Sequence, residues 1–262
     1  MNYVIDKFEN VTSFVNFLNT KPSNKVFADE SSHYSKRTDR SHWFGTTSFE
    51  EAQELFKFGD KAKMQMVQKS FSKLNLSGSG YETRRKVKTS VVGFVPHIPN
   101  FLQGKPDCMI NIVKEKIKSP KVLNIVYNIA VPDGTKAEDM ADAGAKVLTH
   151  LRNMEAQGYR CNLFVMVAVR DDKRTETSIL LVKIKSSNQH LDLLKVAYPL
   201  VNPSMLRRHH FRYLEVSKIT KPFFNWTYGI PIKEESEVRK ALGASFKCDY
   251  YFNHESAMAL EF

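Results

Sequence analysis

The chain of 262 residues is 42% hydrophobic and carries a formal net charge of +11, with 39 Lys and Arg against 28 Asp and Glu. This composition predicts one large or two modest folded domains, and three widely spaced cysteines exclude a disulfide scaffold. The sequence has neither an apolar run long enough to span a bilayer nor the apolar core of a signal peptide, so we expect a cytoplasmic protein with no membrane partner.

The N-terminal part of the chain has helical signals. Residues 1–40 predict a short helix followed by a polar connector. Ser48 and Glu51 have the spacing of a capping box, which predicts that a helix begins at Phe49. Apolar residues at helical spacing predict a second helix over about 61–74.

Positive charge is concentrated between positions 61 and 90, where eight basic residues stand against a single acid, Glu82. The segment also contains the Gly-Ser-Gly stretch 78–80. Such a local excess of cations is the charge pattern of a nucleic-acid-binding surface, whereas a solvated helix face is the alternative for the lysines. The predicted contact residues here are Lys61, Lys63, Lys69, Lys73, Arg84, Arg85, Lys86 and Lys88.

The chain changes character over residues 81–119. Two prolines and a glycine between positions 93 and 99 exclude a regular central strand beyond Val92. We therefore expect an extended loop that carries aromatic side chains and lies beside the basic segment.

From residue 120 the hydrophobic pattern is that of an α/β domain. An apolar run at 122–131, an amphipathic helix at 136–157 and a second apolar run at 159–169 predict a right-handed βαβ unit. A third strand is predicted at 177–185, in a hairpin with the second. Residues 191–201 fit a helix or a strand.

A second basic cluster lies in a helix predicted over 204–215. Arg207 and Arg208 are candidate nucleic-acid contacts, because a guanidinium group can bind phosphates by two hydrogen bonds or stack on bases. They fit equally well as partners of acids inside the fold. The neighbouring His209 and His210 contribute little charge at neutral pH.

The two tryptophans lie near basic residues and could stack on unpaired bases. Trp43 precedes the predicted capping box, and Trp226 belongs to the aromatic run 223–228. Exposed rings stack on bases while Lys and Arg contact the backbone, which favours single strands over duplex. Packing in the core is the alternative, because Trp buries a large apolar area.

Carboxylates cluster around the loop after the first core strand, where open sheets bind ligands. The loop resembles the metal loop of von Willebrand factor A-like domains, which reads Asp-x-Ser-x-Ser. Asp133 matches the first ligand, but Thr135 replaces a serine and Ala137 cannot serve as the third ligand. We therefore expect no metal site and no cofactor, and we interpret Glu138 and Asp139 as acids at a helix N-terminus.

Four segments together resemble a family encoded by tailed bacteriophages. They are residues 43–52 (WFGTTSFEEA), 93–100 (GFVPHIPN), 104–109 (GKPDCM) and 203–208 (PSMLRR). Size, basic charge and this setting also make the chain similar to the single-stranded-DNA-binding transcription accessory factors of N4-like phages. The resemblance implies the cytoplasm of a bacterial host and a phage RNA polymerase, or another replication or transcription protein, as a partner. The aromatic C-terminal segment would then contact the polymerase or pack as a terminal segment.

The predicted fold is a helical, basic region over 1–119 followed by an α/β core over 120–262, with a mixed sheet, flanking helices and an aromatic C-terminal segment. A von Willebrand A-like arrangement of this core is one interpretation. The predicted function is noncatalytic binding of single-stranded DNA, as an accessory factor for phage transcription or replication that recruits a polymerase. The alternatives are a von Willebrand A-like scaffold that binds a host or phage protein, and a metal-dependent nucleic-acid hydrolase.

Overall fold

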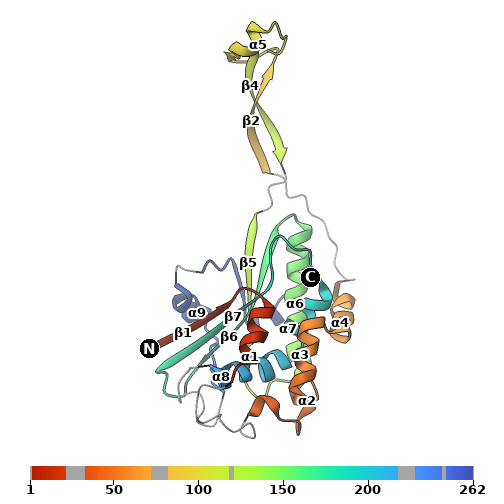
Figure 1. The fold of residues 1–262 in the computed structure, drawn as a ribbon, viewed down its shortest axis with the longest axis vertical. Coiled ribbons are helices and arrows are strands. Elements are labelled where there is room, and N and C mark those ends of the chain that lie inside the picture. Colours follow the sequence, from red (N-terminus) through yellow and green to blue (C-terminus); the bar gives the residue numbers. More distant parts are fainter. Residues whose placement is uncertain are drawn as a thin grey trace.

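The computed structural model describes residues 2–21, 33–71, 82–117, 121–217, 228–243 and 246–261. Figure 1 shows an α/β body and a slender arm that stands away from it. The main sheet has the strand order β1-β7-β6-β5-β9, with β8 beside β6, and helices pack on it. The predicted α/β class, with a mixed sheet and flanking helices, is confirmed.

The strands of the main sheet run in both directions. β5 is parallel to β6 and β9, and β1 is parallel to β7, whereas β6 and β7 form an antiparallel hairpin. The predicted βαβ unit is therefore present as β5, α6 and β6, and the predicted hairpin follows it. The strands are β1 (Asn2–Phe8), β5 (Val122–Asn128), β6 (Arg160–Arg170), β7 (Glu176–Lys185), β8 (Ile230–Pro231) and β9 (Tyr250–Phe252).

Successive side chains of a strand point to opposite faces, so the two faces of the sheet have separate cores. Leu163 and Val165 of β6 belong to the larger core, whereas Phe164 and Met166 belong to the smaller one. The smaller core is covered by α9 (Glu235–Leu242). The larger core is covered by α1 (Val11–Leu18), α3 (Phe49–Phe58), α4 (Lys61–Phe71), α6 (Ala137–Ala156), α7 (Leu193–Val201), α8 (Phe211–Val216) and α10 (His254–Met258).

Of the two edge strands of the sheet, β1 differs from the sequence prediction and β9 agrees with one of its two alternatives. β1 comes from the N-terminal region that was expected to be helical, and it places Val4 and Phe8 against the larger core while Ile5 is 40% exposed. The main sheet therefore takes strands from both sides of residue 119. At the other edge, Tyr251 and Phe252 are buried in β9, which shows that the aromatic C-terminal segment is packed.

Local hydrogen bonds explain where the helices begin. The Ser48 hydroxyl accepts from the Glu51 amide at 3.0 Å, and α3 begins at Phe49 as predicted. The second half of the capping box differs, because the Glu51 carboxylate accepts from the Thr47 amide and hydroxyl, both at 2.6 Å. Asp192 caps the ambiguous segment 191–201, which forms the helix α7.

The arm replaces the extended loop expected over 81–119. β2 (Glu82–Ser90) and β4 (Met109–Ile117) form an antiparallel ladder, and the two-residue strand β3 (Val95–Pro96) pairs with the first two residues of β4. The short helix α5 (Ile98–Leu102) completes the end of the arm (Figure 1). The prolines keep β3 short, because proline cannot donate to a ladder.

Three short helices complete the body. They are the 3-10 helix η3 (Tyr34–Lys36), α2 (Ser41–Phe44) and the π-helix η4 (Met205–His210), which continues directly into α8. No helix in the described ranges combines the length and the apolar character that crossing a bilayer requires.

The close packing of α6 against α7 gives the first testable prediction. A Cβ atom at Gly144 of α6 would overlap the backbone carbonyl of Leu200 in α7. We expect Gly144→Ala to lower the free energy of unfolding by about 1–3 kcal/mol, because the two helices must separate. Gly134→Ala is the control, since nothing lies within 4 Å of the added atom. Equal urea midpoints for the two variants would contradict the expected close contact.

Candidate functional site

Exposed cations line the arm. Arg85, Lys86 and Lys88 of β2 are exposed, as is Lys114 of β4. The antiparallel register places Arg85 directly opposite Lys114, and neither has an ion-pair partner within the described part of the chain. Like charges that face each other across a ladder destabilise it. A bound anion would remove this repulsion, so the arm has the electrostatics of an anion-binding surface.

The end of the arm is unusually apolar for a solvent-exposed surface. Phe94 is 61% exposed and Phe101 is 64% exposed. Exposed apolar groups of this kind mark sites of interaction with another molecule. The exposed apolar side chains at the arm end are Val91, Val92, Phe94, Val95, Ile98, Phe101 and Leu102.

Three other predicted cations of the first basic segment lie on the body. Lys61 and Lys69 are exposed on α4, and Lys63 is half-buried there. Figure 1 shows α4 packed on the body and β2 on the arm, so the predicted cations occupy two separate surfaces. Lys73, Trp226 and the side chain of Arg84 lie outside the described residues.

Arg207 and Arg208 do not lie on a solvent-facing basic surface, because they are 1% and 0% exposed. The Arg208 guanidinium donates from Nε to the Thr46 hydroxyl at 2.7 Å and from Nη2 to the Thr46 carbonyl at 2.9 Å. Its Nη1 donates to the carbonyls of Ser35 and Arg37, at 2.8 and 3.1 Å. Burial lowers the pKa of Arg208, and carbonyl dipoles with one hydroxyl take the place of a carboxylate.

A third arginine, Arg212 of α8, does pair with an acid inside the fold. Arg212 lies 3.6 Å from the fully buried Glu215, and its Nε donates to the Leu18 carbonyl at 3.0 Å. Glu215 also accepts from the amide and the hydroxyl of Ser35, at 2.9 and 2.6 Å. Together with Arg208, these bonds attach the segment 33–48 to η4 and α8.

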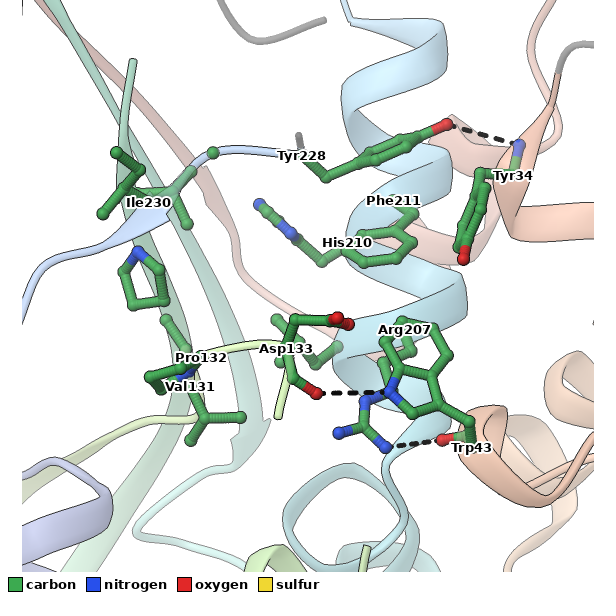
Figure 2. Close-up of a pocket in the computed structure, with 15 residues that line it drawn as sticks. Tyr34, Trp43, Val131, Pro132, Asp133, Arg207, His210, Phe211, Tyr228 and Ile230 are labelled. Atoms are coloured by element: carbon green, nitrogen blue, oxygen red, sulfur yellow. Dashed lines mark hydrogen bonds between the residues drawn. The ribbon is translucent and has the colours of Figure 1, made fainter. Parts of the chain in front are cut away.

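A cavity of about 370 Å³ lies beyond the carboxyl end of β5, beside β6 and η4. Open α/β sheets commonly bind ligands at this position. Figure 2 shows aromatic rings on the helix side of the cavity and smaller apolar side chains on the strand side. The rings belong to Tyr34, Trp43, Phe211 and Tyr228, and the strand side is formed by Val131, Pro132, Val169, Ile230 and Pro231.

Trp43, predicted to stack on bases, is a wall of this cavity and not part of the arm. Its Nε1 donates to the Asp133 carbonyl at 3.3 Å, and the Arg207 guanidinium lies 4.2 Å from its ring centroid (Figure 2). Arg207 donates to the carbonyls of Trp43 and Thr135, at 2.5 and 2.6 Å. One face of the indole is therefore already covered.

The polar groups around the cavity have unusual electrostatics. Desolvation lowers the pKa of Arg207 to about 10, although the nearby Asp133 opposes this shift. Burial alone lowers the pKa of His210 to about 3, and neither of its ring nitrogens has a hydrogen-bond partner among the described residues. His210 was counted only as a weak contributor to a basic cluster, and no sequence signal marked its burial.

The loop that resembled a von Willebrand A-like metal loop contributes its backbone to the cavity. Its Asp133 and Thr135 carbonyls are the acceptors for Trp43 and Arg207. Glu138 and Asp139 lie in the first turn of α6, as predicted. Within the described ranges, no three His, Cys, Asp or Glu residues are grouped in a way that could hold a metal ion.

The two arginine environments give a second prediction. Replacing Arg208 with Met leaves the carbonyls of Thr46, Ser35 and Arg37 buried without their donor. We expect Arg208→Met to lower the free energy of unfolding by about 3 kcal/mol or more. The control Arg85→Met removes the same charge from the exposed arm and should change stability by less than about 0.5 kcal/mol. Urea unfolding measures both, and similar losses would refute the structural role of Arg208.

The buried histidines give a third prediction. Burial lowers the folded-state pKa of His209 and of His210 to about 3, while the ordinary value is 6.5. The unfolded chain therefore binds more protons between these values, and stability falls as the pH drops below about 6.5. The slope reaches about 1.4 kcal/mol per pH unit for each histidine.

Urea unfolding between pH 7.5 and pH 5 measures this slope, and His210→Phe should make it shallower. Burial also lowers the pKa of His150, which contributes in the same direction and is common to all variants. Replacing the exposed His190 with Phe is the control and should leave the slope unchanged. A slope that does not respond to His210→Phe would show that His210 already titrates normally.

Comparison with known proteins places the chain in a family. No curated protein and no solved structure matches it. One family matches residues 2–258, a range that includes the body, the arm and the cavity. The chain therefore belongs to the family described as Domain of unknown function (DUF7192).

Proposed function

We propose that the protein binds single-stranded DNA through its arm. The observation that supports this most directly is the pair of exposed cations Arg85 and Lys114, which face each other across the ladder without an anionic partner in the described part of the chain. A phosphate between them would turn a repulsive pair into two charge-assisted hydrogen bonds. The sequence of the arm supports the same partner, since residues 82–117 contain seven Lys and Arg against three Asp and Glu.

Exposed rings support a preference for unpaired bases. Phe94 and Phe101 lie beyond the cationic ladder, at the end of the arm. Base-on-ring stacking requires a base whose face is accessible, which a single strand offers and a duplex does not. Lys86 and Lys88 point to the opposite face of the ladder from Arg85, so a strand that wraps the arm meets cations on both faces.

The apolar side chains at the arm end favour a second role within the same function. Ile98 is 57% exposed and Leu102 is 78% exposed, and apolar groups of this size are typical of protein contacts. An accessory factor that binds DNA and recruits a phage RNA polymerase, or another replication or transcription protein, needs such a contact. The same observation favours the alternative, a scaffold that binds only a protein.

The test compares a fluorescent oligothymidine with a duplex of equal length in anisotropy titrations over a range of salt concentrations. We expect tighter binding to the single strand and an affinity that falls with salt. Arg85→Glu with Lys114→Glu should weaken binding by at least about tenfold and reduce the salt slope by about 1.4, since each phosphate contact on a single strand contributes about 0.7.

The matched control is Lys240→Glu, which changes an exposed cation on α9 and should leave binding within about twofold. Preference for the duplex would reject the single-strand specificity. Equal effects of the arm and α9 variants would reject the arm as the site. Binding to neither oligonucleotide, together with a partner that stays bound after nuclease treatment, would favour the scaffold.

A further inference from the structure

The cavity contains a buried polar side chain that has no hydrogen-bond partner in the part of the chain that the structure describes. His210 is 1% exposed, and neither Nδ1 nor Nε2 makes a hydrogen bond within the described ranges. Figure 2 shows its imidazole extending from the helix toward the strand side of the cavity. Buried polar groups are nearly always hydrogen-bonded, and an exception in a native structure requires a reason. A molecule in the cavity that bonds to the imidazole would supply that reason.

The protonation state of His210 limits what this molecule can be. The imidazole is neutral at physiological pH, because burial among rings disfavours its charged form. A neutral imidazole presents one N–H donor and one nitrogen acceptor. The complementary ligand therefore carries a neutral donor or acceptor, such as a ring nitrogen, an amino group or a carbonyl oxygen. A carboxylate that needs a charged histidine is a poor match.

The walls indicate a flat, aromatic ligand. Phe211 and Tyr228 are stacked with their centroids 4.3 Å apart, and Tyr34 lies 5.9 Å from Phe211. The opposite wall is formed by the loop after β5 and by β8, which contribute Pro132 and Ile230. Rings facing smaller apolar side chains across about 370 Å³ form a space suited to a planar ring system.

The positive charge of Arg207 at the cavity wall excludes a quaternary ammonium ligand, which aromatic cavities often bind. Aromatic cages bind quaternary ammonium groups through cation–π contacts. Here the guanidinium of Arg207 already covers Trp43 at 4.2 Å, and this buried cation has no ion pair within the described part of the chain. It would repel a second cation and attract an electron-rich ring or an anionic substituent.

We propose that this cavity binds a planar nitrogen heterocycle of the nucleobase class, which contacts the Phe211 and Tyr228 side and hydrogen-bonds to His210 through its polar edge. The ring can come from a free nucleotide or from an unstacked base of a nucleic-acid strand, because both present the same edge. The argument rests on the cavity alone and does not depend on the arm.

The test is calorimetric titration of the full chain with AMP, GMP, CMP and dTMP, and with ribose 5-phosphate as a probe that lacks the ring. At least one nucleotide should bind at the cavity, and ribose 5-phosphate should not compete with it. His210→Phe keeps a ring but removes both nitrogens, so it should weaken nucleotide binding roughly five- to tenfold. Ile230→Trp adds bulk at a 39% exposed wall position and should abolish it.

The control is His190→Phe, an exposed histidine that does not line the cavity, and it should bind nucleotide as the wild type does. Circular dichroism and thermal unfolding show which variants are folded. If His210→Phe does not fold, the result for Ile230→Trp decides the outcome. An oligonucleotide that displaces the nucleotide identifies a base in a strand as the source, and one that does not identifies the free nucleotide. The proposal is overturned if no nucleotide binds at millimolar concentration, or if folded His210→Phe and Ile230→Trp both bind like the wild type.

Discussion

The fold of the body depends on the hydrogen bonds that the buried Arg208 makes. Its guanidinium is fully buried and donates to the backbone of a segment that contains only two short helices. Among the described residues no other donor to these carbonyls is charged, and the carbonyls are the main compensation for the burial of the cation, beside the Thr46 hydroxyl and the Phe44 ring. The buried carbonyls and the Arg208 guanidinium therefore each require the other. Because Tyr34 and Trp43 belong to this segment, the aromatic side of the cavity is placed by a bond network that lies behind it.

The π-helix η4 allows one short stretch of chain both to bind the segment 33–48 and to line the cavity. π-helical turns are rare and occur frequently at functional sites. In η4, four consecutive basic residues are buried, yet they meet different surroundings. Arg208 contacts the segment 33–48, and His209 bonds to the Tyr198 hydroxyl at 3.1 Å. Arg207 and His210, three positions apart, both reach the cavity.

The sequence predicted the body well because its strands and helices follow simple patterns. The apolar runs that became β5 and β6 are buried on both faces, and the apolar stripe of α6 repeats at helical spacing. β1 was missed because it is an edge strand whose polar Asp6 and Lys7 interrupt the pattern. The arm was missed for a related reason. Both faces of β2 meet solvent, so its sequence lacks the alternation of apolar and polar residues that predicts a strand.

The candidate sites were harder to predict than the fold. Charge counting singled out the segment that contains the exposed Arg85, but it left Arg207 and Arg208 open between nucleic-acid contact and pairing inside the fold, because composition does not report which carbonyls surround a cation. The cavity draws residues from segments near positions 34, 43, 131, 207 and 228, and no sequence motif marks these segments as parts of one cavity. Only the fold brings them together.

The arm has a further physical consequence, which follows from its lack of an interior. A narrow ribbon with solvent on both faces is marginally stable in water, because few apolar contacts reinforce its backbone hydrogen bonds. Whatever binds the arm therefore also contributes to holding its two long strands together, and part of the free energy of association is used to maintain that pairing. The body, in contrast, is ordered by its own two cores, so local opening and closing of the arm can proceed while the rest of the molecule stays folded.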